Sequence, residues 1–267
     1  MTNWSDRAMD LSRIDDATTE VVLDTKGDPT HTQIIQRGLG ALRAAQDTHD
    51  LAAALRELEA SPPAGTPDEL DIMERAMRAA AVAHEKQLRK EGGVPYIAHP
   101  LVVALHLAWS GYSRECLAAA LVHDVIEDTD WDETRLSAAL GAGSDHCMAL
   151  VRFATELPKD VPWHTRKAAV VSKLAGADRD ARALVIADKG HNLRSLLQAL
   201  RQRGNTAWAV LRHGQPEQSW FAHALARAIR DEPGEPFASF RATVDAAVSE
   251  GWLRVPTESE GAGRRFT

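Results

Sequence analysis

Hydrophobic residues recur at helical spacing along most of the chain, and turn-forming residues separate the runs. A capping box with proline at the first helical position, residues 66–69, predicts the start of a helix that runs towards Lys90. Further helices are predicted at about residues 100–110, 113–128, 132–140, 145–156, 164–175, 179–202, 216–231 and 235–249. Alanine is abundant and aromatic residues make up only 5% of the chain, which favours closely packed helices over a β sandwich. The pattern therefore predicts an all-α helical bundle.

Three parts are expected along the 267 residues. Residues 1–61 form an N-terminal extension, with a brief strand at 18–23 and amphipathic helical stretches between about 32 and 60. After the proline-rich breaker at 61–65, residues 62–250 form the main domain, which is long enough to bury a full core. Residues 251–267 are a polar tail that we expect to fray. We expect the extension to pack on its own domain; the alternative is that this amphipathic arm docks a partner.

Composition narrows the function classes. The net charge of −7 argues against general electrostatic binding of nucleic acid, although it leaves room for a local basic pocket. Cys116 and Cys147 are too few for a disulfide framework, so we expect buried thiols. The first 16 residues lack a signal-peptide core, and no apolar run is long enough to cross a membrane. We therefore expect a cytoplasmic protein without a membrane partner.

The strongest chemical signal lies at residues 121–129, where four ionisable side chains interrupt an apolar helical run. Helical spacing places His123 on one face with Glu127, and Asp124 on one face with Asp128. A buried imidazole with three carboxylates is unfavourable unless a cation or a substrate compensates the charge. The stretch therefore predicts half of a metal site.

The other half is expected at two further positions. His99 lies just before an apolar run, and Asp188 lies just after one. Two histidines and two aspartates offer mixed nitrogen and oxygen ligands, which suit Mn²⁺, Fe²⁺, Zn²⁺ or a similar divalent ion. The alternative is a set of core histidines and helix caps without a metal.

The order His99, His123-Asp124, Asp188 resembles that of the HD-domain metal-dependent phosphohydrolases. Four flanking segments make the resemblance narrower, because they are similar to the hydrolase domain of RelA/SpoT-type alarmone enzymes and their small stand-alone relatives. These segments are residues 83–90, 93–100, 117–129 and 187–195, and weaker similarity continues through Trp208 and Trp220. The resemblance implies an HD-domain helical bundle.

The resemblance also implies an activity: Mn²⁺-dependent hydrolysis of the 3′-pyrophosphate of ppGpp or pppGpp, which yields pyrophosphate and GDP or GTP. It assigns the metal to His99, His123, Asp124 and Asp188. It assigns Glu127 and Asp128 to the orientation or deprotonation of the attacking water. The substrate contacts it implies are Arg89, Lys90, Tyr96, Lys189 and Asn192, with Lys159, Arg166 and Lys167 as further candidates for the 5′-phosphates.

Two alternatives stay open: departures from the family pattern leave room for another substrate, and the amphipathic N-terminal arm leaves room for a protein partner. Lys86 replaces a usual glycine, the segment 90–95 is longer than the common version, and residues 215–221 lack an Arg and a Tyr that clasp phosphate in some relatives. One alternative is a hydrolase that detoxifies the products of a small alarmone synthetase toxin, acting on adenosine alarmones or on pyrophosphorylated tRNA 3′ ends. The other is an antitoxin that neutralises such a synthetase by direct binding.

Overall fold

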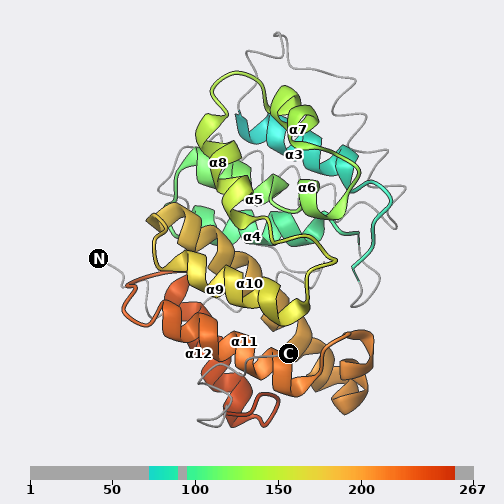
Figure 1. The fold of residues 1–267 in the computed structure, drawn as a ribbon, viewed down its shortest axis with the longest axis vertical. Helices are drawn as coiled ribbons and strands as arrows, with labels where there is room; N and C mark the ends of the chain where they lie inside the picture. The colour runs from blue at the N-terminus through green and yellow to red at the C-terminus, as the bar shows by residue number, and fades with distance from the viewer. Residues whose placement is uncertain (1–71, 90–94, 256–267) are drawn as a thin grey trace.

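The computed structural model describes residues 72–89 and 95–255, and in these ranges the chain folds into helices without a β-strand (Figure 1). This confirms the predicted all-α class. The α-helices are α3 (Ile72–Ala83), α4 (Ala98–Trp109), α5 (Arg114–Val122), α6 (Val125–Asp128), α7 (Glu133–Leu140), α8 (Asp145–Ala154), α9 (Trp163–Leu174), α10 (Arg179–Arg203), α11 (Gln215–Ala228) and α12 (Phe237–Ser249). A 3₁₀-helix that the pattern did not predict, η4 (Gly204–Val210), follows α10.

Several predictions concern residues outside the described ranges. These are the N-terminal extension 1–61 with its strand, the capping box at 66–69, Lys90, and most of the tail 251–267. The division of the chain into three parts therefore stays a prediction. No helix within the described ranges combines the length and apolar composition needed to span a bilayer.

Local side-chain caps explain where three helices begin. The side chain of the residue before each helix accepts a hydrogen bond from a backbone N–H of the first turn, which has no partner inside the helix. The pairs are Ser113 with Cys116 at 3.2 Å, Asp132 with Arg135 at 2.7 Å, and Asp178 with Ala181 at 2.8 Å. These caps are visible in the sequence, so the predicted starts of α5, α7 and α10 agree with the structure to within one residue.

The helix predicted to run towards Lys90 is wrong at its C-terminal end, because α3 stops at Ala83. The next residues turn, and the Gln87 carbonyl accepts a hydrogen bond from the Tyr96 N–H at 2.9 Å. An antiparallel bridge between Leu88 and Pro95 adjoins this bond. The backbone beyond Ala83 thus pairs with residues 95 and 96, which a helical pattern does not reveal.

The helix predicted at 113–128 is also wrong, since it is two helices. α5 ends at Val122 and α6 begins at Val125, so His123 and Asp124 lie at the break. A helical hydrogen bond from the Asp128 N–H to the Asp124 carbonyl, 2.8 Å, still carries one turn across it. Asp124 and Asp128 therefore stay one turn apart although the helix is interrupted.

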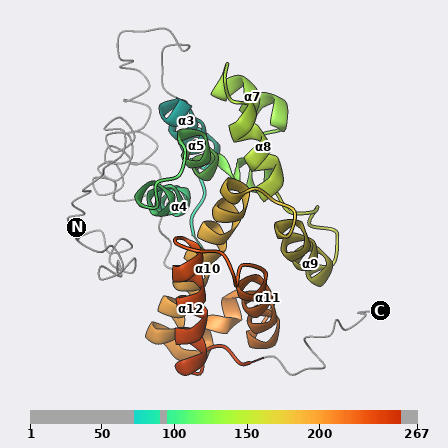
Figure 2. The ribbon, with the colours of Figure 1, turned by 90° about the vertical axis from the view of Figure 1, so that its left-hand side faces the viewer.

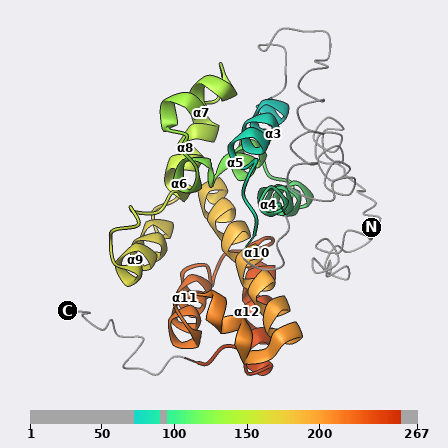
Figure 3. The ribbon, with the colours of Figure 1, turned by 90° about the vertical axis from the view of Figure 1, so that its right-hand side faces the viewer.

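Helix α10 organises the packing. It contacts α4, α5 and α8 as well as η4 and α12, and Figures 2 and 3 show it running from the upper group of helices to α11 and α12. In the upper group α3 packs along α5, and both bury alanines, which allow helix axes to approach closely. Larger side chains such as Leu101, Leu117 and Leu121 are at most 1% exposed, and each stabilises the fold by roughly 1.5–3 kcal/mol. The core therefore holds α4, the α5–α6 break and α10 against one another.

The two cysteines agree with the sequence prediction. Cys116 and Cys147 are both buried and neither forms a disulfide. Burial raises the pKa of the Cys116 thiol, and it raises that of Cys147 to about 12, so both stay protonated. They serve as small core residues.

Candidate metal centre and active site

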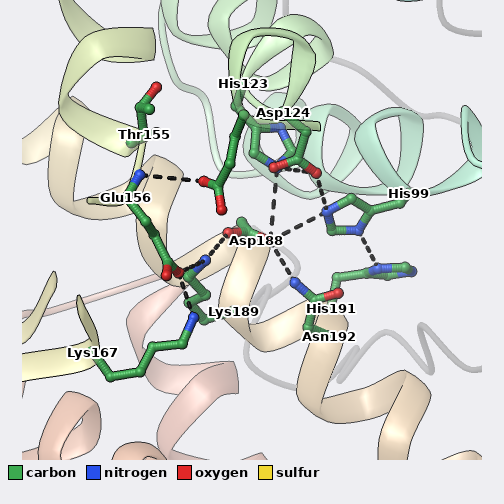
Figure 4. A network of polar contacts seen from close by, with 12 residues as sticks. His99, His123, Asp124, Thr155, Glu156, Lys167, Asp188, Lys189, His191 and Asn192 are labelled. Carbon is green, nitrogen blue, oxygen red and sulfur yellow. Dashed lines mark hydrogen bonds and ion pairs between the residues drawn. The ribbon is translucent and has the colours of Figure 1, made fainter. Parts of the chain in front are cut away.

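Four predicted ligands meet where three elements converge (Figure 4). His99 is the second residue of α4, His123 and Asp124 lie at the α5–α6 break, and Asp188 is buried in α10. One ligand atom each from His99, His123 and Asp124 lie within 4.8 Å of one another. Asp188 Oδ1 lies 3.2 Å from His99 Nε2 and 3.7 Å from His123 Nε2. The structure thus brings together residues that are up to 89 positions apart in the sequence.

The histidine tautomers leave bare nitrogens aimed at the carboxylates. His123 Nδ1 lies 2.8 Å from the Ala120 carbonyl, which can only accept, so this nitrogen carries the proton. In the neutral form that binds a metal, the ring presents an unprotonated Nε2 to Asp124 Oδ2 at 3.2 Å. Among residues 72–89 and 95–255, neither His123 Nε2 nor His99 Nε2 has a hydrogen-bond partner. Lone pairs that face carboxylate oxygens in a buried site fit a divalent cation.

His191 sets the second imidazole in the same way. His99 Nδ1 and His191 Nδ1 are 2.7 Å apart, and both rings are at most 4% exposed. If His99 Nδ1 donates this bond, its Nε2 is free to bind a cation. The sequence analysis missed His191, although a buried histidine three positions after Asp188 is a usable signal.

The pKa values of the ligands also indicate that the centre favours a positive charge between its carboxylates. Burial would lower the pKa of His123, but Asp124 raises it well above its usual value. Burial would raise the pKa of Asp124, but His123 holds it well below its usual range. The pKa of Asp188 is also held far down, by Lys189 and the imidazoles, against the effect of burial. The carboxylates are therefore ionised and demand positive charge between them.

Two predicted substrate contacts brace Asp188. Lys189 Nζ lies 2.8 Å from Asp188 Oδ2, and the Asn192 amide donates to Asp188 Oδ1 at 2.7 Å. The Oδ1 atom of Asn192 accepts from both terminal nitrogens of Arg89 at 3.2 Å. Asn192 therefore links the predicted metal ligand to the predicted base-binding Arg89.

The predicted acidic pair points in two directions. Glu127 Oε2 accepts the Glu156 backbone N–H at 3.2 Å, and burial raises the pKa of Glu127 although Lys189 opposes this. Asp128 pairs with Lys159 at 2.8 Å and lies 3.2 Å from the Tyr96 hydroxyl. Glu127 is thus held by a backbone N–H, whereas Asp128 is held by two side chains.

The Tyr96 hydroxyl lies on the metal centre, at 2.5 Å from Asp124 Oδ2. Burial and the neighbouring carboxylate of Asp124 raise the pKa of Tyr96, so the phenol stays neutral and donates. The shared contact of Tyr96 with Asp124 and Asp128 also confirms that these two carboxylates occupy one face.

A buried carboxylate that the sequence analysis missed, Glu156, lies against three cations, of which Figure 4 labels Lys167 and Lys189. Lys167 lies 2.5 Å, Lys189 3.0 Å and Arg166 3.2 Å from its oxygens. Burial would raise the pKa of Glu156, but Lys189 and Lys167 lower it to about 2. For the lysines the balance differs: burial lowers the pKa of Lys167, whereas Asp188 holds that of Lys189 well above its usual value despite burial.

This cluster separates the three further candidates for phosphate contacts into two partly buried side chains and one exposed side chain. Arg166 and Lys167 are only 15% exposed at their side chains and lie against Glu156, whereas Lys159 is 65% exposed. With one carboxylate and three cations, the cluster has an excess of positive charge beside Asp188. It is a local basic region in an acidic chain.

Comparison with known proteins agrees with this geometry. A family model described as HD domain matches residues 76–216. The chain is 40% identical over 130 residues to a protein named probable GTP pyrophosphokinase from Mycobacterium leprae, which covers 48% of this chain and 16% of that protein. It is 38% identical over 120 residues to a Haemophilus influenzae protein named guanosine-3′,5′-bis(diphosphate) 3′-pyrophosphohydrolase, which covers 43% of this chain and 17% of that protein.

Two solved structures share the fold. The crystal structure of lmo0812 from Listeria monocytogenes has a TM-score of 0.52 and 28% identity, and the match covers 57% of this chain and 99% of that one. A metazoan orthologue of SpoT, described as hydrolysing ppGpp, has a TM-score of 0.53, with 69% of this chain and 98% of that one covered. At 23% identity this second likeness shows the fold alone.

The two sequence relatives are much longer proteins, and the chain spans about a sixth of the length of each. Because the HD-domain model matches more than half of the 267 residues and includes all four predicted ligands, the chain belongs to the HD-domain family.

Proposed function

We propose that this protein is a divalent-metal-dependent hydrolase that removes the 3′-pyrophosphate of guanosine alarmones. ppGpp or pppGpp would yield GDP or GTP together with pyrophosphate. The observation that carries the proposal is the pair of bare histidine Nε2 atoms facing ionised Asp124 and Asp188, with a base candidate and a cation cluster adjoining. The name of the Haemophilus relative supports the reaction.

The proposed ligands of the ion are His99, His123, Asp124 and Asp188. This mixed nitrogen and oxygen set suits Mn²⁺, which is the metal we propose. When bound, a divalent ion lowers the pKa of a water molecule and offsets the negative charge that builds on phosphorus. His191 and the Ala120 carbonyl keep the two imidazoles in the tautomer that binds it.

Glu127 is the proposed proton acceptor for the attacking water. Its raised pKa brings it closer to neutral pH than an exposed glutamate, and the Glu156 N–H holds one of its oxygens. Asp128 is held by Lys159 and Tyr96 and is proposed to orient the water.

The proposed substrate contacts extend on both sides of Asp188. On one side the Arg89 guanidinium, held by Asn192, offers a flat cation on which a purine can stack. On the other side Lys189, Arg166 and Lys167 offer charge to phosphate oxygens. Lys90, the partner of Arg89 in the motif, lies outside the described residues.

Hydrolysis of a nucleotide is preferred over the toxin–antitoxin alternatives. The reported relatives have names that refer to guanosine nucleotides, and none refers to a toxin or to tRNA. The local cluster offers three cations, enough to pair with a few phosphate oxygens, and the net charge of −7 disfavours a long nucleic acid.

The test is pyrophosphate release from ppGpp, ppApp and 3′-pyrophosphorylated tRNA by Mn²⁺-loaded protein, with Asp124→Asn as the blank. We expect release from ppGpp, with GDP as the second product. Release from tRNA alone would move the protein to the detoxifying alternative, and faster release from ppApp would change the base preference.

A further inference from the structure

We propose that Tyr96 is a positioning residue of the metal centre: its hydroxyl fixes the carboxylate of Asp124 and joins it to Asp128. The family resemblance places this tyrosine among the substrate contacts, so this is a different role. The inference rests on the proposed metal centre.

The Tyr96 hydroxyl contacts the Asp124 oxygen that faces both imidazoles of the proposed metal centre. Tyr96 Oη lies 2.5 Å from Asp124 Oδ2, and that same oxygen lies 3.4 Å from His99 Nε2 and 3.2 Å from His123 Nε2. A phenol has one proton and can donate to one acceptor at a time. The shorter distance assigns the proton to Asp124, as a charge-assisted hydrogen bond.

Asp128 has another charged partner in place of that proton. Its Oδ2 lies 3.2 Å from the hydroxyl, while its Oδ1 is paired with Lys159 Nζ at 2.8 Å. The phenol therefore sits between two carboxylates, one bonded strongly and one held nearby. This arrangement fixes the spacing between Asp124 and Asp128.

The ring that carries the hydroxyl is itself held. The ring of His84, which is 2% exposed, stacks on Tyr96 with centroids 4.7 Å apart and an interplanar angle of 29°. His84 Nδ1 bonds Gln87 Oε1 at 2.8 Å, and the Gln87 amide donates to the Asp128 carbonyl at 2.5 Å. The Tyr96 N–H in turn donates to the Gln87 carbonyl at 2.9 Å. Side chain and backbone thus fix the phenol relative to α6.

Such a hydrogen bond to a metal-ligating carboxylate orients the ligand, and losing an outer partner of this kind typically weakens metal binding about 10–100-fold. A residue that contacts only the substrate would have no such effect. Metal affinity therefore separates the two roles.

The test is Tyr96→Phe in the full chain, which removes one oxygen and keeps the ring that stacks on His84. Mn²⁺ affinity of chelator-stripped protein is measured by calorimetry. We expect binding about 10–100-fold weaker than in the unchanged protein. The matched control is Tyr112→Phe, because the other tyrosine of the chain bonds the Glu235 carbonyl at 3.1 Å, away from the centre. Its Mn²⁺ affinity should be unchanged.

Three further outcomes are informative. Equal Mn²⁺ affinity of Tyr96→Phe and the unchanged protein, with a raised KM for ppGpp, overturns the positioning role and restores the substrate contact. Weaker Mn²⁺ binding with KM unchanged at saturating metal supports it. If the unchanged protein binds no ion at this site, the proposed metal centre itself fails. Thermal unfolding of the metal-free Tyr96→Phe protein, expected as one cooperative transition above the temperature of the titration, shows that the variant is folded when its affinity is measured.

Discussion

Hydrogen bonds within the protein set the orientation of the two imidazoles, those of His99 and His123. The Ala120 carbonyl orients His123, and His191 orients His99, both at hydrogen-bond distance. The remaining nitrogens face Asp124 and Asp188, whose pKa values are held well below the usual range. A site made in this way is preorganised for a cation before the cation arrives.

The buried carboxylate of Glu156 makes the stability of the fold depend on pH. Its pKa is lowered to about 2, so its ionisation stabilises the fold above its ordinary pKa and the stabilisation is lost as pH falls towards 2. At neutral pH the contribution amounts to as much as about 3 kcal/mol. We expect Glu156→Gln to lower the free energy of unfolding by that order at pH 7, and by less than half as much at pH 3.

Urea unfolding of the metal-free proteins at both pH values measures the difference. Glu133→Gln is the matched control, because Glu133 is 51% exposed and pairs only at the surface with Arg152. A gap between the unchanged protein and Glu156→Gln that stays constant from pH 7 to pH 3 would contradict the account.

At the scale of elements, the α5–α6 break is the feature that builds the site. A straight helix would keep His123 and Asp124 in the ladder, whereas the observed break turns His123 back to the Ala120 carbonyl. Helix α10 then brings Asp188, Lys189 and Asn192 to the break from a distant part of the sequence. Its ends matter because it packs against both groups of helices.

The end of α10 gives the second prediction. Gly204 follows the helix with φ 60° and ψ −151°, a backbone conformation that is essentially confined to glycine and costs a residue with a side chain roughly 1–3 kcal/mol. A Cβ there meets no atom within 4 Å, so only the backbone term acts. We expect Gly204→Ala to lower the free energy of unfolding by roughly 1–3 kcal/mol in urea titrations.

Gly176 is the control for that substitution. It has no positive φ, and a Cβ there also meets nothing within 4 Å. Gly176→Ala should be neutral or should stabilise by up to about 1 kcal/mol, through the unfolded chain. Equal losses at Gly204 and Gly176 would contradict the backbone argument.

The sequence predicted most helix positions, but it did not predict the end of α3 or the break between α5 and α6. Helix positions and three starts were predicted because apolar periodicity and capping side chains are local signals. The end of α3 at Ala83 was not, because the loop after it bonds to Tyr96 and Pro95, a contact made only in the fold. The break at His123 was missed because neither His nor Asp is a strong helix breaker.

The same division holds for the site. The four ligands were predicted, since ionisable residues within an apolar run or at its end are a local signal. Glu156 was missed because its three cations come from α9 and α10, and nothing beside it in the sequence marks it as buried. His191 was missed because its partner His99 is 92 positions away.

At the scale of the whole molecule, the proposed ion joins α4, the α5–α6 break and α10 in one site. An ion that binds only the folded chain stabilises it, by about 2.7 kcal/mol at a hundred times its Kd. For a folded region of this size that corresponds to a rise in Tm of roughly 5–10 °C. We therefore expect added Mn²⁺ to raise the Tm of chelator-stripped protein by that order, and the rise to be absent in Asp124→Asn.

Calorimetric or dye-based melting measures this shift. Asp130→Asn is the matched control, since Asp130 is 88% exposed and lies six residues along the same segment. It should keep the full rise. A rise in Asp124→Asn equal to that of the unchanged protein would mean that Mn²⁺ binds elsewhere.

The most direct test of the central claim is a titration of chelator-stripped protein with Mn²⁺, in which bound metal and pyrophosphate release from ppGpp are measured on the same samples. The account predicts no release without metal, release that rises in proportion to occupancy and saturates near one ion per chain, and none from Asp124→Asn. Release that is independent of metal, or an Asp124→Asn protein that retains it, would contradict the claim that these four residues and their ion hydrolyse the alarmone.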